Sequence, residues 1–438
     1  MKTRKVYYRL LLMVIILAFW LPVSARTMKE TRETYSFETA VKPDTPIILK
    51  NKEGSLTVET WDRSSVKVDM TVVIDGAEDQ VKKVLDAISK IKFTQDSEAV
   101  TFNTKFYKMM LGQIPGHFKV VLLDGSSAKL TRLDLFVVLT MPKGNPLSLF
   151  QAYEKVTLPD LDGKVLLDLY ESDLVAGKLP GCQQINMKYS NARIDSVQDI
   201  SVNLYETRFS LQHAGTVKLH SKYSGVSLMN AGAVTIDSYE DKIDIIRHGD
   251  LDVKAKYTTF NLADFNKGTF DLYECQMKGG SGNILAIGAK YCAIEFLFCK
   301  AIVFISAYEN KFIAEAVGDF KAGSSYSTYT ISKLDGTMIF QNSYEDKITV
   351  KEVLKKFGGI TINSKYSDVQ LSFEPPALYK LDVSLKYSDL DYPKESFREI
   401  RYHKEDDSFR YVGVKQGADE STAPLVQLDM YEGGIKVK

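Results

Sequence analysis

A dipeptide that returns every seventeen residues and alternates between two forms is the strongest constraint on this chain. The forms are Lys-Tyr and Tyr-Glu, and the repeats begin at residues 188, 205, 222, 239, 256, 273 and 290. Self-similarity at a short fixed period is typical of solenoids, in which each repeat packs only on its neighbours. We therefore expect an all-β chain that folds as a single-stranded β-helix (β-solenoid) with turns of about 17 residues.

The turn that begins at Gly215 shows how each repeat is built. Residues 217–222 alternate between apolar and polar side chains, which predicts a strand with one buried face. Tyr223 then marks a corner, and a second short strand follows it. Gly215, Gly232 and Gly249 share the 17-residue spacing, and we expect them to occupy bends that need a positive φ. Each turn should therefore hold two strands and two bends.

The register of the apolar residues explains the alternation. They lie four and six positions before the tyrosine in Lys-Tyr turns, but three and five before it in Tyr-Glu turns. Aligning them places Tyr239 over Lys222 and Glu240 over Tyr223. Since stacked strands lie about 4.8 Å apart, alternation separates like charges and offers each lysine an aromatic neighbour. The rival geometry is one 34-residue turn, which would stack lysine on lysine.

The predicted outward column is a candidate binding stripe. Aromatic and polar groups in a flat array can stack sugars or dock extended proteins. The alternative is that the stripe only holds the corners together. Its members are Lys188, Tyr205, Lys222, Tyr239, Lys256, Tyr273, Lys290 and Tyr308.

Four segments are expected along the chain. Residues 1–25 resemble a signal peptide, with a basic start, an apolar core and a small-residue cleavage site; a membrane anchor is the alternative. Residues 26–145 should hold the first strands and an N-terminal α/β cap, in which an amphipathic helix over 78–91 covers the open end of the solenoid. An apolar insertion at 106–123 either packs on this cap or forms a partner patch. Residues 146–395 form the regular solenoid, and 396–438 a polar loop followed by closing strands.

The composition disfavours several function classes. Lys+Arg and Asp+Glu both total 56, so the net charge is zero, whereas a nucleic-acid partner favours a basic surface. None of the five histidines has a metal-ligand spacing, and no nucleophile or phosphate-loop motif occurs. Glu240-Asp241 and Glu345-Asp346 offer too few oxygens for a cation, so we expect solvated corners. We predict no catalytic residues, no metal and no cofactor.

The cysteines add one further question. Cys275 and Cys292 are one period apart and should stack on adjacent turns. The strand spacing suits a disulfide, but parallel Cβ vectors suit it poorly. Two packed free thiols are the preferred interpretation.

Three motifs resemble exported bacterial "putative adhesin" β-solenoid proteins, of the head-GIN type and related domains of unknown function. They are NKEGSLTVETWD at 51–62, the Ser-Lys-Tyr-Ser units at Ser221 and Ser364, and YEGGIKV at 431–437. The resemblance covers the chain after residue 25 and implies a right-handed β-helix in the cell envelope, without established catalytic residues. Because Lys-Tyr or Tyr-Glu replaces the family's usual Ser-Gly-Asp corner, no family ligand is transferred to these residues.

The sequence therefore predicts a non-enzymatic, exported envelope or surface protein in the periplasm, on the cell surface or outside the cell. Its partner would be a glycan or a protein held by the stripe, with no nucleic acid and no transmembrane segment after signal cleavage. One alternative is a structural scaffold that docks through residues 106–123. Another is a carbohydrate-active enzyme, which the insertion-free turns from Lys188 to Lys290 disfavour because such sites are usually built on loops.

Overall fold

The structure is a computed structural model that describes residues 30–96, 98–114 and 116–438. The predicted signal peptide lies outside these residues. The chain is all-β, with 71% strand and 3% helix, and its β-solenoid has about 13 turns of about 18 residues. Two compact units are distinguished: the first comprises 30–35, 70–91 and 106–135, and the second 36–69, 92–105 and 136–438.

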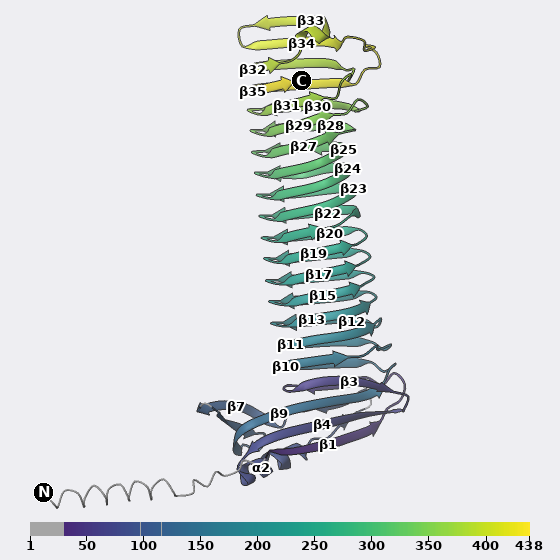
Figure 1. Ribbon diagram of the computed structural model, residues 1–438, viewed down its shortest axis with the longest axis vertical. Coiled ribbons are helices and arrows are strands. Elements are labelled where there is room, and N and C mark those ends of the chain that lie inside the picture. The colour runs from purple at the N-terminus through teal and green to yellow at the C-terminus, as the bar shows by residue number, and fades with distance from the viewer. Residues whose placement is uncertain (1–29, 97, 115) are drawn as a thin grey trace, which may run out of the picture. The chain divides into compact units, whose positions relative to one another are not determined.

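Along the chain, the elements run from an N-terminal part through a middle part to a C-terminal part, and Figure 1 labels many of them. The first part contains β1 (Thr31–Ala40), β2 (Ile47–Asn51), β3 (Ser55–Trp61), β4 (Ser65–Gly76), α2 (Glu78–Ile88), β5 (Thr94–Gln95), β6 (Val100–Asn103), β7 (Tyr107–Ile114), β8 (His117–Leu122) and β9 (Ser127–Pro142). Next come β10 (Leu147–Leu158), β11 (Val165–Leu179), β12 (Cys182–Lys188), β13 (Asn191–Val197), β14 (Ile200–Tyr205), β15 (Arg208–His213), β16 (Val217–Lys222), β17 (Gly225–Asn230), β18 (Val234–Tyr239), β19 (Lys242–Arg247), β20 (Leu251–Lys256), β21 (Thr259–Leu262) and β22 (Phe265–Tyr273). The last part contains β23 (Gln276–Lys290), β24 (Ala293–Tyr308), β25 (Lys311–Ala322), β26 (Ser324–Ser325), β27 (Thr328–Leu334), β28 (Thr337–Tyr344), β29 (Lys347–Val353), β30 (Gly359–Lys365), β31 (Asp368–Phe373), β32 (Lys380–Asp391), η1 (Lys394–Ser396), β33 (Phe397–Glu405), β34 (Ser408–Lys415) and β35 (Leu425–Val437).

Each regular turn contributes one strand to each of two parallel stacks. In one stack β14 pairs with β16 and β16 with β18; in the other β15 pairs with β17 and β17 with β19. Alternate residues point inward, so that Val217, Leu219 and Ser221 of β16 are buried while the residues between them are exposed. The turns of the second unit stack along Figure 1, and their inward side chains form one continuous core.

The expected positive φ of Gly215, Gly232 and Gly249 is wrong, since none of them lies in the left-handed region. These glycines instead allow close stacking of the bends. The Gly232 amide donates to the Gly215 carbonyl at 2.7 Å, and a Cβ on Gly232 would lie 2.7 Å from that same oxygen. A side chain would therefore push adjacent turns apart.

The end of the chain also differs from the expected polar loop. Residues 397–415 form an antiparallel hairpin of β33 and β34, and β34 pairs with β32. The closing strand β35 does not cover the end of the stack, because it lies between β30 and β32 and is parallel to both. The polar composition that suggested a loop belongs to β33, whose side chains are exposed from Arg398 to Glu405.

The first unit contains the predicted helix, α2, which ends at Ile88 rather than Ile91. Its apolar stripe buries Val81, Val84 and Ile88, and within the unit the Tyr35 hydroxyl donates to the Leu85 carbonyl. The amphipathic pattern thus identified a real helix. Its role as a cap for the solenoid stays a prediction.

Candidate functional site

The predicted outward column is present in the predicted register. Lys222 pairs with Tyr205 on one side and with Tyr239 on the other, and the same alternation continues through all eight residues of the candidate stripe, from Lys188 to Tyr308. One turn of the chain therefore advances by one strand. The rival 34-residue turn is excluded, since Lys222 does not lie beside Lys256.

The tyrosines pack on one another to form a continuous row, which we call the tyrosine ladder. Consecutive ring centroids lie 5.3–5.9 Å apart with interplanar angles of 66–88°, the edge-to-face geometry that aromatic rings favour. In spatial order its members are Tyr153, Tyr170, Tyr189, Tyr205, Tyr223, Tyr239, Tyr257, Tyr273, Tyr291, Tyr308, Tyr326, Tyr344, Tyr366, Tyr431 and Tyr387. Sequence reasoning missed these contacts, although the alternating columns bring each tyrosine diagonally beside the next.

Tyrosine, rather than lysine, is thus the main neighbour of each ladder ring. Among the ladder lysines of the described chain, cation–π contacts occur for Lys290, which lies 4.9 Å from the Tyr291 ring centroid and 5.1 Å from that of Tyr308, and for Lys386 beside Tyr387. Each lysine of the candidate stripe thus has a tyrosine beside it in the column, as expected, but this neighbour does not always give a cation–π contact. The ladder gains its order from ring-to-ring packing.

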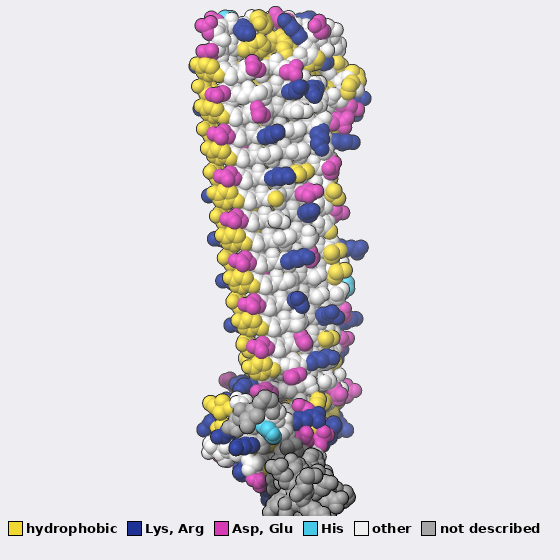
Figure 2. Space-filling view, turned by 60° about the vertical axis from the view of Figure 1, so that its left-hand side comes forward, with side chains coloured by type: hydrophobic (Ala, Val, Ile, Leu, Met, Phe, Trp, Pro, Cys, Tyr) yellow, Lys and Arg dark blue, Asp and Glu magenta, His cyan; other side chains and the backbone are white. Residues whose placement is uncertain are grey.

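The two charges of the repeat lie on opposite sides of the ladder. In Figure 2 the yellow tyrosines form a column along the left edge, with magenta carboxylates to its right and dark blue lysines to its left. The Glu side chains hydrogen-bond to ladder hydroxyls: the pKa of Tyr170 is raised chiefly by its bond to Glu171, and that of Tyr239 chiefly by its bond to Glu240. The hydroxyls of Tyr170 and Tyr239 therefore stay protonated at neutral pH.

At each corner, one residue adopts the left-handed backbone conformation. The second residue of every dipeptide from Glu171 to Tyr387, and Glu432 as well, has a φ between 47° and 59°. This conformation is unusual for side chains as large as Tyr and Glu. The corner is therefore held by its surroundings rather than by the preference of these residues.

The surroundings include a buried polar column formed by the residue that follows each dipeptide. Its side chain typically accepts the backbone N–H of the matching residue one turn earlier, as Ser224 Oγ does from Thr207 at 3.0 Å, and donates to the carbonyl two residues before it. The column supplies acceptors to amides that have no water available. It comprises Ser172, Ser190, Thr207, Ser224, Asp241, Thr258, Cys275, Cys292, Asn310, Ser327, Asp346 and Ser367.

Cys275 and Cys292 are neighbours in this column and are free thiols, as are Cys182 and Cys299. The Cys292 sulfur accepts a hydrogen bond from the Cys275 amide at 3.4 Å, so it takes the acceptor role that a serine oxygen has in other turns. The pKa of Cys275 is raised by its contact with Cys292 and by burial. The preferred interpretation of two packed thiols agrees with this geometry, and the alternative disulfide is not formed.

At each of the two acidic corners one carboxylate is buried, so neither corner is fully solvated as expected. Glu240 and Glu345 are exposed, but Asp241 and Asp346 are only 5% and 3% exposed and belong to the buried polar column. Burial raises the pKa of both aspartates, and Asp241 accepts hydrogen bonds from the Ser224 amide and the Ser238 hydroxyl. Among the described residues, no group of three or more His, Cys, Asp or Glu side chains could hold a metal ion.

A groove of about 590 Å³ runs beside the ladder on the lysine side, and we call it the tyrosine groove. Polar side chains from the middle of the strands form its other wall, where the Asn203 amide donates to Asn186 at 2.8 Å and His220 lies 3.6 Å from Asp237. Its outward-facing lining consists of Asp168, Tyr170, Asn186, Lys188, Asn203, Tyr205, His220, Lys222, Asp237 and Tyr239.

A second groove of about 730 Å³ lies over the other strand stack at the same height. It is lined by Arg193, Arg208 and Lys242 together with Asp173 and Asp244, and by no ladder tyrosine. Of these two grooves, the tyrosine groove combines aromatic rings with polar side chains.

The predicted apolar insertion belongs to the first unit, where it forms the hairpin of β7 and β8. Phe106 and Tyr107 are buried, whereas Met109, Leu111 and Leu123 are 45–49% exposed. β8 also pairs with β9, but in the described part of the chain the outer edge of β7 has no strand partner. One end of the insertion is therefore packed and the other is an exposed apolar edge, while packing on the cap and docking of a partner both stay predictions.

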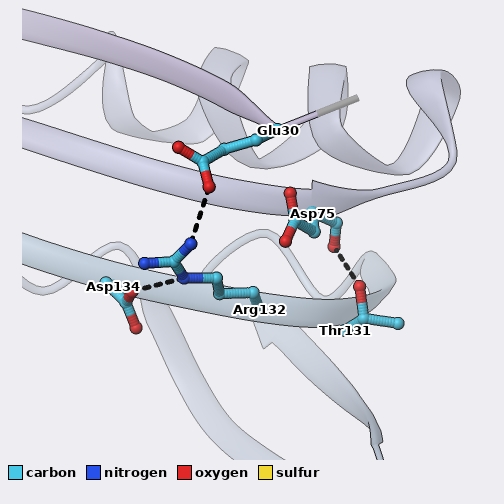
Figure 3. A network of polar contacts seen from close by, with 5 residues as sticks. All are labelled: Glu30, Asp75, Thr131, Arg132 and Asp134. Carbon is cyan, nitrogen blue, oxygen red and sulfur yellow. Dashed lines mark hydrogen bonds and ion pairs between the residues drawn. The ribbon is translucent and has the colours of Figure 1, made fainter. Parts of the chain in front are cut away.

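The first unit also holds a surface network that Figure 3 shows in detail. Arg132 Nη1 lies 2.7 Å from Glu30, its Nε lies 2.6 Å from Asp134, and the Thr131 hydroxyl donates to the Asp75 carbonyl at 3.1 Å. The hydrogen bond to Asp134 raises the pKa of Arg132. Because these ion pairs are solvent-exposed, we assign them a local structural role.

Comparisons with known proteins assign neither a family nor a ligand to this chain. No family model and no curated protein matches the chain. Among solved structures it is similar to a "putative cell adhesion protein" from Clostridium sporogenes, with 7% identity, a TM-score of 0.16, and coverage of 94% of this chain and 99% of that one. It is also similar to a "putative lipid binding protein" from Parabacteroides distasonis, with 10% identity, a TM-score of 0.19, and coverage of 69% and 93%. The solenoid agrees with the expected "putative adhesin" class of fold, and no family model confirms the head-GIN type.

No helix among the described residues is long and apolar enough to span a membrane.

Proposed function

We propose that this chain is a non-enzymatic, exported protein of the cell envelope or surface that binds an extended glycan along the tyrosine groove. The observation that carries the proposal is the composition of this groove. Tyr170, Tyr205 and Tyr239 line one wall, and amide, imidazole and carboxylate groups line the other. Flat aromatic rings beside polar groups suit sugars, which have apolar C–H faces and hydroxyl edges.

The spacing and charge of the groove narrow the ligand class. Equivalent tyrosines recur every second turn, or about 9.6 Å at the usual strand spacing. This length is close to the disaccharide repeat of extended β-1,4-linked glycans. Lys188 and Lys222 are balanced by Asp168 and Asp237, which favours an uncharged chain over a polyanion.

The same geometry supports binding rather than cleavage. Asp168 and Asp237 are separated by four strand steps, or about 19 Å, whereas glycosidases hold two carboxyl groups within about 10 Å. The other groups of the polar wall between them are Asn186, Asn203 and His220. We therefore infer that the groove holds a glycan without hydrolysing it.

Binding of soluble β-1,4-linked oligosaccharides by isothermal calorimetry, after a glycan-array screen, tests this function. The Tyr205→Ala/Tyr239→Ala variant should lose at least about tenfold in affinity, because two stacking contacts are removed. The matched control is Tyr308→Ala/Tyr344→Ala, which interrupts the ladder outside the groove and should bind as the unmodified protein does. Equal loss in both variants, or no loss in folded Tyr205→Ala/Tyr239→Ala protein, would contradict the proposal.

A scaffold role is the second candidate, and the exposed edge of β7 favours it. An extended segment of a partner protein could add to this edge and cover Met109 and Leu111. The variant Met109→Lys/Leu111→Lys should then lose a crosslinked envelope partner that the unmodified protein retains. Retention of every partner would contradict the scaffold role and leave the glycan proposal unaffected.

A further inference from the structure

The C-terminal strand β35 is one of the stacked strands of the solenoid and lies between two turns that precede it in sequence. Thr361 of β30 pairs with Gln427, and Asp382 of β32 pairs with that same residue from the other side. The second half of β35 continues in the same way, since Ile435 lies between Val369 and Leu390. β35 therefore fills a slot with a parallel strand edge on each side.

The corner alternation explains why β35 belongs in this slot. In sequence order Lys365-Tyr366 is followed by Lys386-Tyr387, so that two Lys-Tyr corners would stack directly. β35 places Tyr431-Glu432 between them and restores the alternation. The tyrosine ladder then continues, with ring centroids 5.7 Å apart from Tyr366 to Tyr431 and 5.5 Å apart from Tyr431 to Tyr387.

The slot also selects its strand by shape. Val426 and Leu428 are fully buried and Ile435 nearly so, which requires apolar side chains in this register. After the corner, Gly433 has a φ of 146°, and a Cβ there would lie 2.0 Å from the Ser367 carbonyl oxygen. Only glycine fits this position, so the slot requires an apolar strand that is followed by a Tyr-Glu-Gly corner.

The segment that leads into the slot is an exposed connection. Residues 416–424 join β34 to β35, and Asp419, Glu420 and Ser421 are exposed. An identical strand from another molecule would meet the same two edges and the same glycine pocket.

We propose that this slot is a strand-accepting site, filled by β35 of the same molecule or by β35 of a second copy, so that two copies can be joined by strand exchange. Direct closure of the slot would stack Lys386 on Lys365 and Tyr387 on Tyr366, which breaks the alternation. The site therefore stays selective for a Tyr-Glu corner.

Peptide exchange into the folded protein tests the slot. A protease site inserted between Asp419 and Glu420 allows β35 to be cut free of its connection after folding. A fluorescent peptide of residues 423–438 should then enter the nicked protein at one per chain, measured by anisotropy. The Gly433→Ala peptide should bind at least tenfold more weakly, whereas the Gly434→Ala peptide, whose new Cβ would meet only the Asp368 side chain at 3.1 Å, should bind like the native peptide.

Two outcomes would overturn the slot: release of β35 with no peptide uptake, or equal uptake of all three peptides. The uncut full chain tests the second copy. After brief partial denaturation at high concentration, light scattering should detect a dimer that excess peptide suppresses and that the Gly433→Ala chain does not form. A chain that stays monomeric, or a dimer that persists with excess peptide, would overturn strand exchange.

Discussion

At the scale of single residues, the position after each dipeptide from Tyr170-Glu171 to Lys365-Tyr366 holds the corner together. Its small polar side chain supplies the acceptor that a buried amide of the preceding turn requires, and Ser, Thr, Asn, Asp and Cys all serve. The aspartates at 241 and 346 meet the same requirement with a charge that burial opposes. This compromise makes stability at these corners depend on pH.

We predict that Asp241→Asn reduces the dependence of stability on pH. Burial raises the pKa of Asp241 in the folded protein above its ordinary value of 3.8, so the folded state binds the proton more tightly than the unfolded state. The stabilisation is present below about pH 3.8 and is lost as pH rises through the folded-state pKa. Thermal unfolding between pH 4 and 7 should show a smaller decrease with rising pH for the variant.

The control for this variant is Glu240→Gln, since Glu240 is exposed at the same corner. It should keep the pH dependence of the unmodified protein. A pH profile of Asp241→Asn that matches the unmodified protein would show that this carboxyl group does not contribute.

At the scale of the element, the corner is a unit whose two forms must alternate. Lysines and glutamates occupy opposite sides of the ladder. Within a column, a tyrosine of the intervening turn separates each charged residue from the next one of the same charge. The alternation also brings each ring diagonally against the next at edge-to-face angles. Charge separation and ring packing therefore follow from one sequence rule.

Changing one corner to the wrong form tests this rule. In Lys222→Tyr/Tyr223→Glu, the introduced carboxylate would lie between Glu206 and Glu240, about 4.8 Å from each, and the diagonal ring contacts would be lost. We expect a loss of about 1–3 kcal/mol in the free energy of unfolding, measured by denaturant titration. The control Lys222→Arg/Tyr223→Phe keeps a basic residue followed by an aromatic ring. Its free energy of unfolding should change by less than about 1 kcal/mol. A swapped corner as stable as this control would contradict the rule.

At the scale of the whole solenoid, each turn packs only on its neighbours, so turns can be removed if the alternation is kept. Deleting residues 224–257 removes two turns and stacks Lys222-Tyr223 on Tyr273-Glu274. Deleting residues 207–223 or 224–240 removes a single turn and stacks two corners of the same form. The paired deletion should therefore be tolerated better than either single one.

Thermal unfolding followed by circular dichroism measures this difference. We expect the two-turn deletion to unfold cooperatively near the midpoint of the intact protein and both one-turn deletions to unfold at lower temperature, although they lose fewer residues. One-turn deletions at least as stable as the two-turn deletion would show that alternation does not govern stacking.

Much of the solenoid could be predicted from the sequence, because a turn contacts only the turns beside it. The 17-residue spacing and the shift of the apolar residues were sufficient to place Tyr239 on Lys222 and to expect Cys275 beside Cys292. Such relations depend on short segments with a fixed period, which the order of residues records directly.

The tertiary structure decided what depends on side-chain direction or on distant segments. Ring orientation in the ladder and the groove beside it arise only when neighbouring turns are in place. The position of β35 depends on contacts between residues such as Thr361 and Gln427, which are far apart in sequence. Two successive Lys-Tyr corners and a late Tyr-Glu pair are a sequence signal for this insertion. Only the stacked structure shows that these corners are neighbours, because the strands of a solenoid pair between turns rather than within one turn.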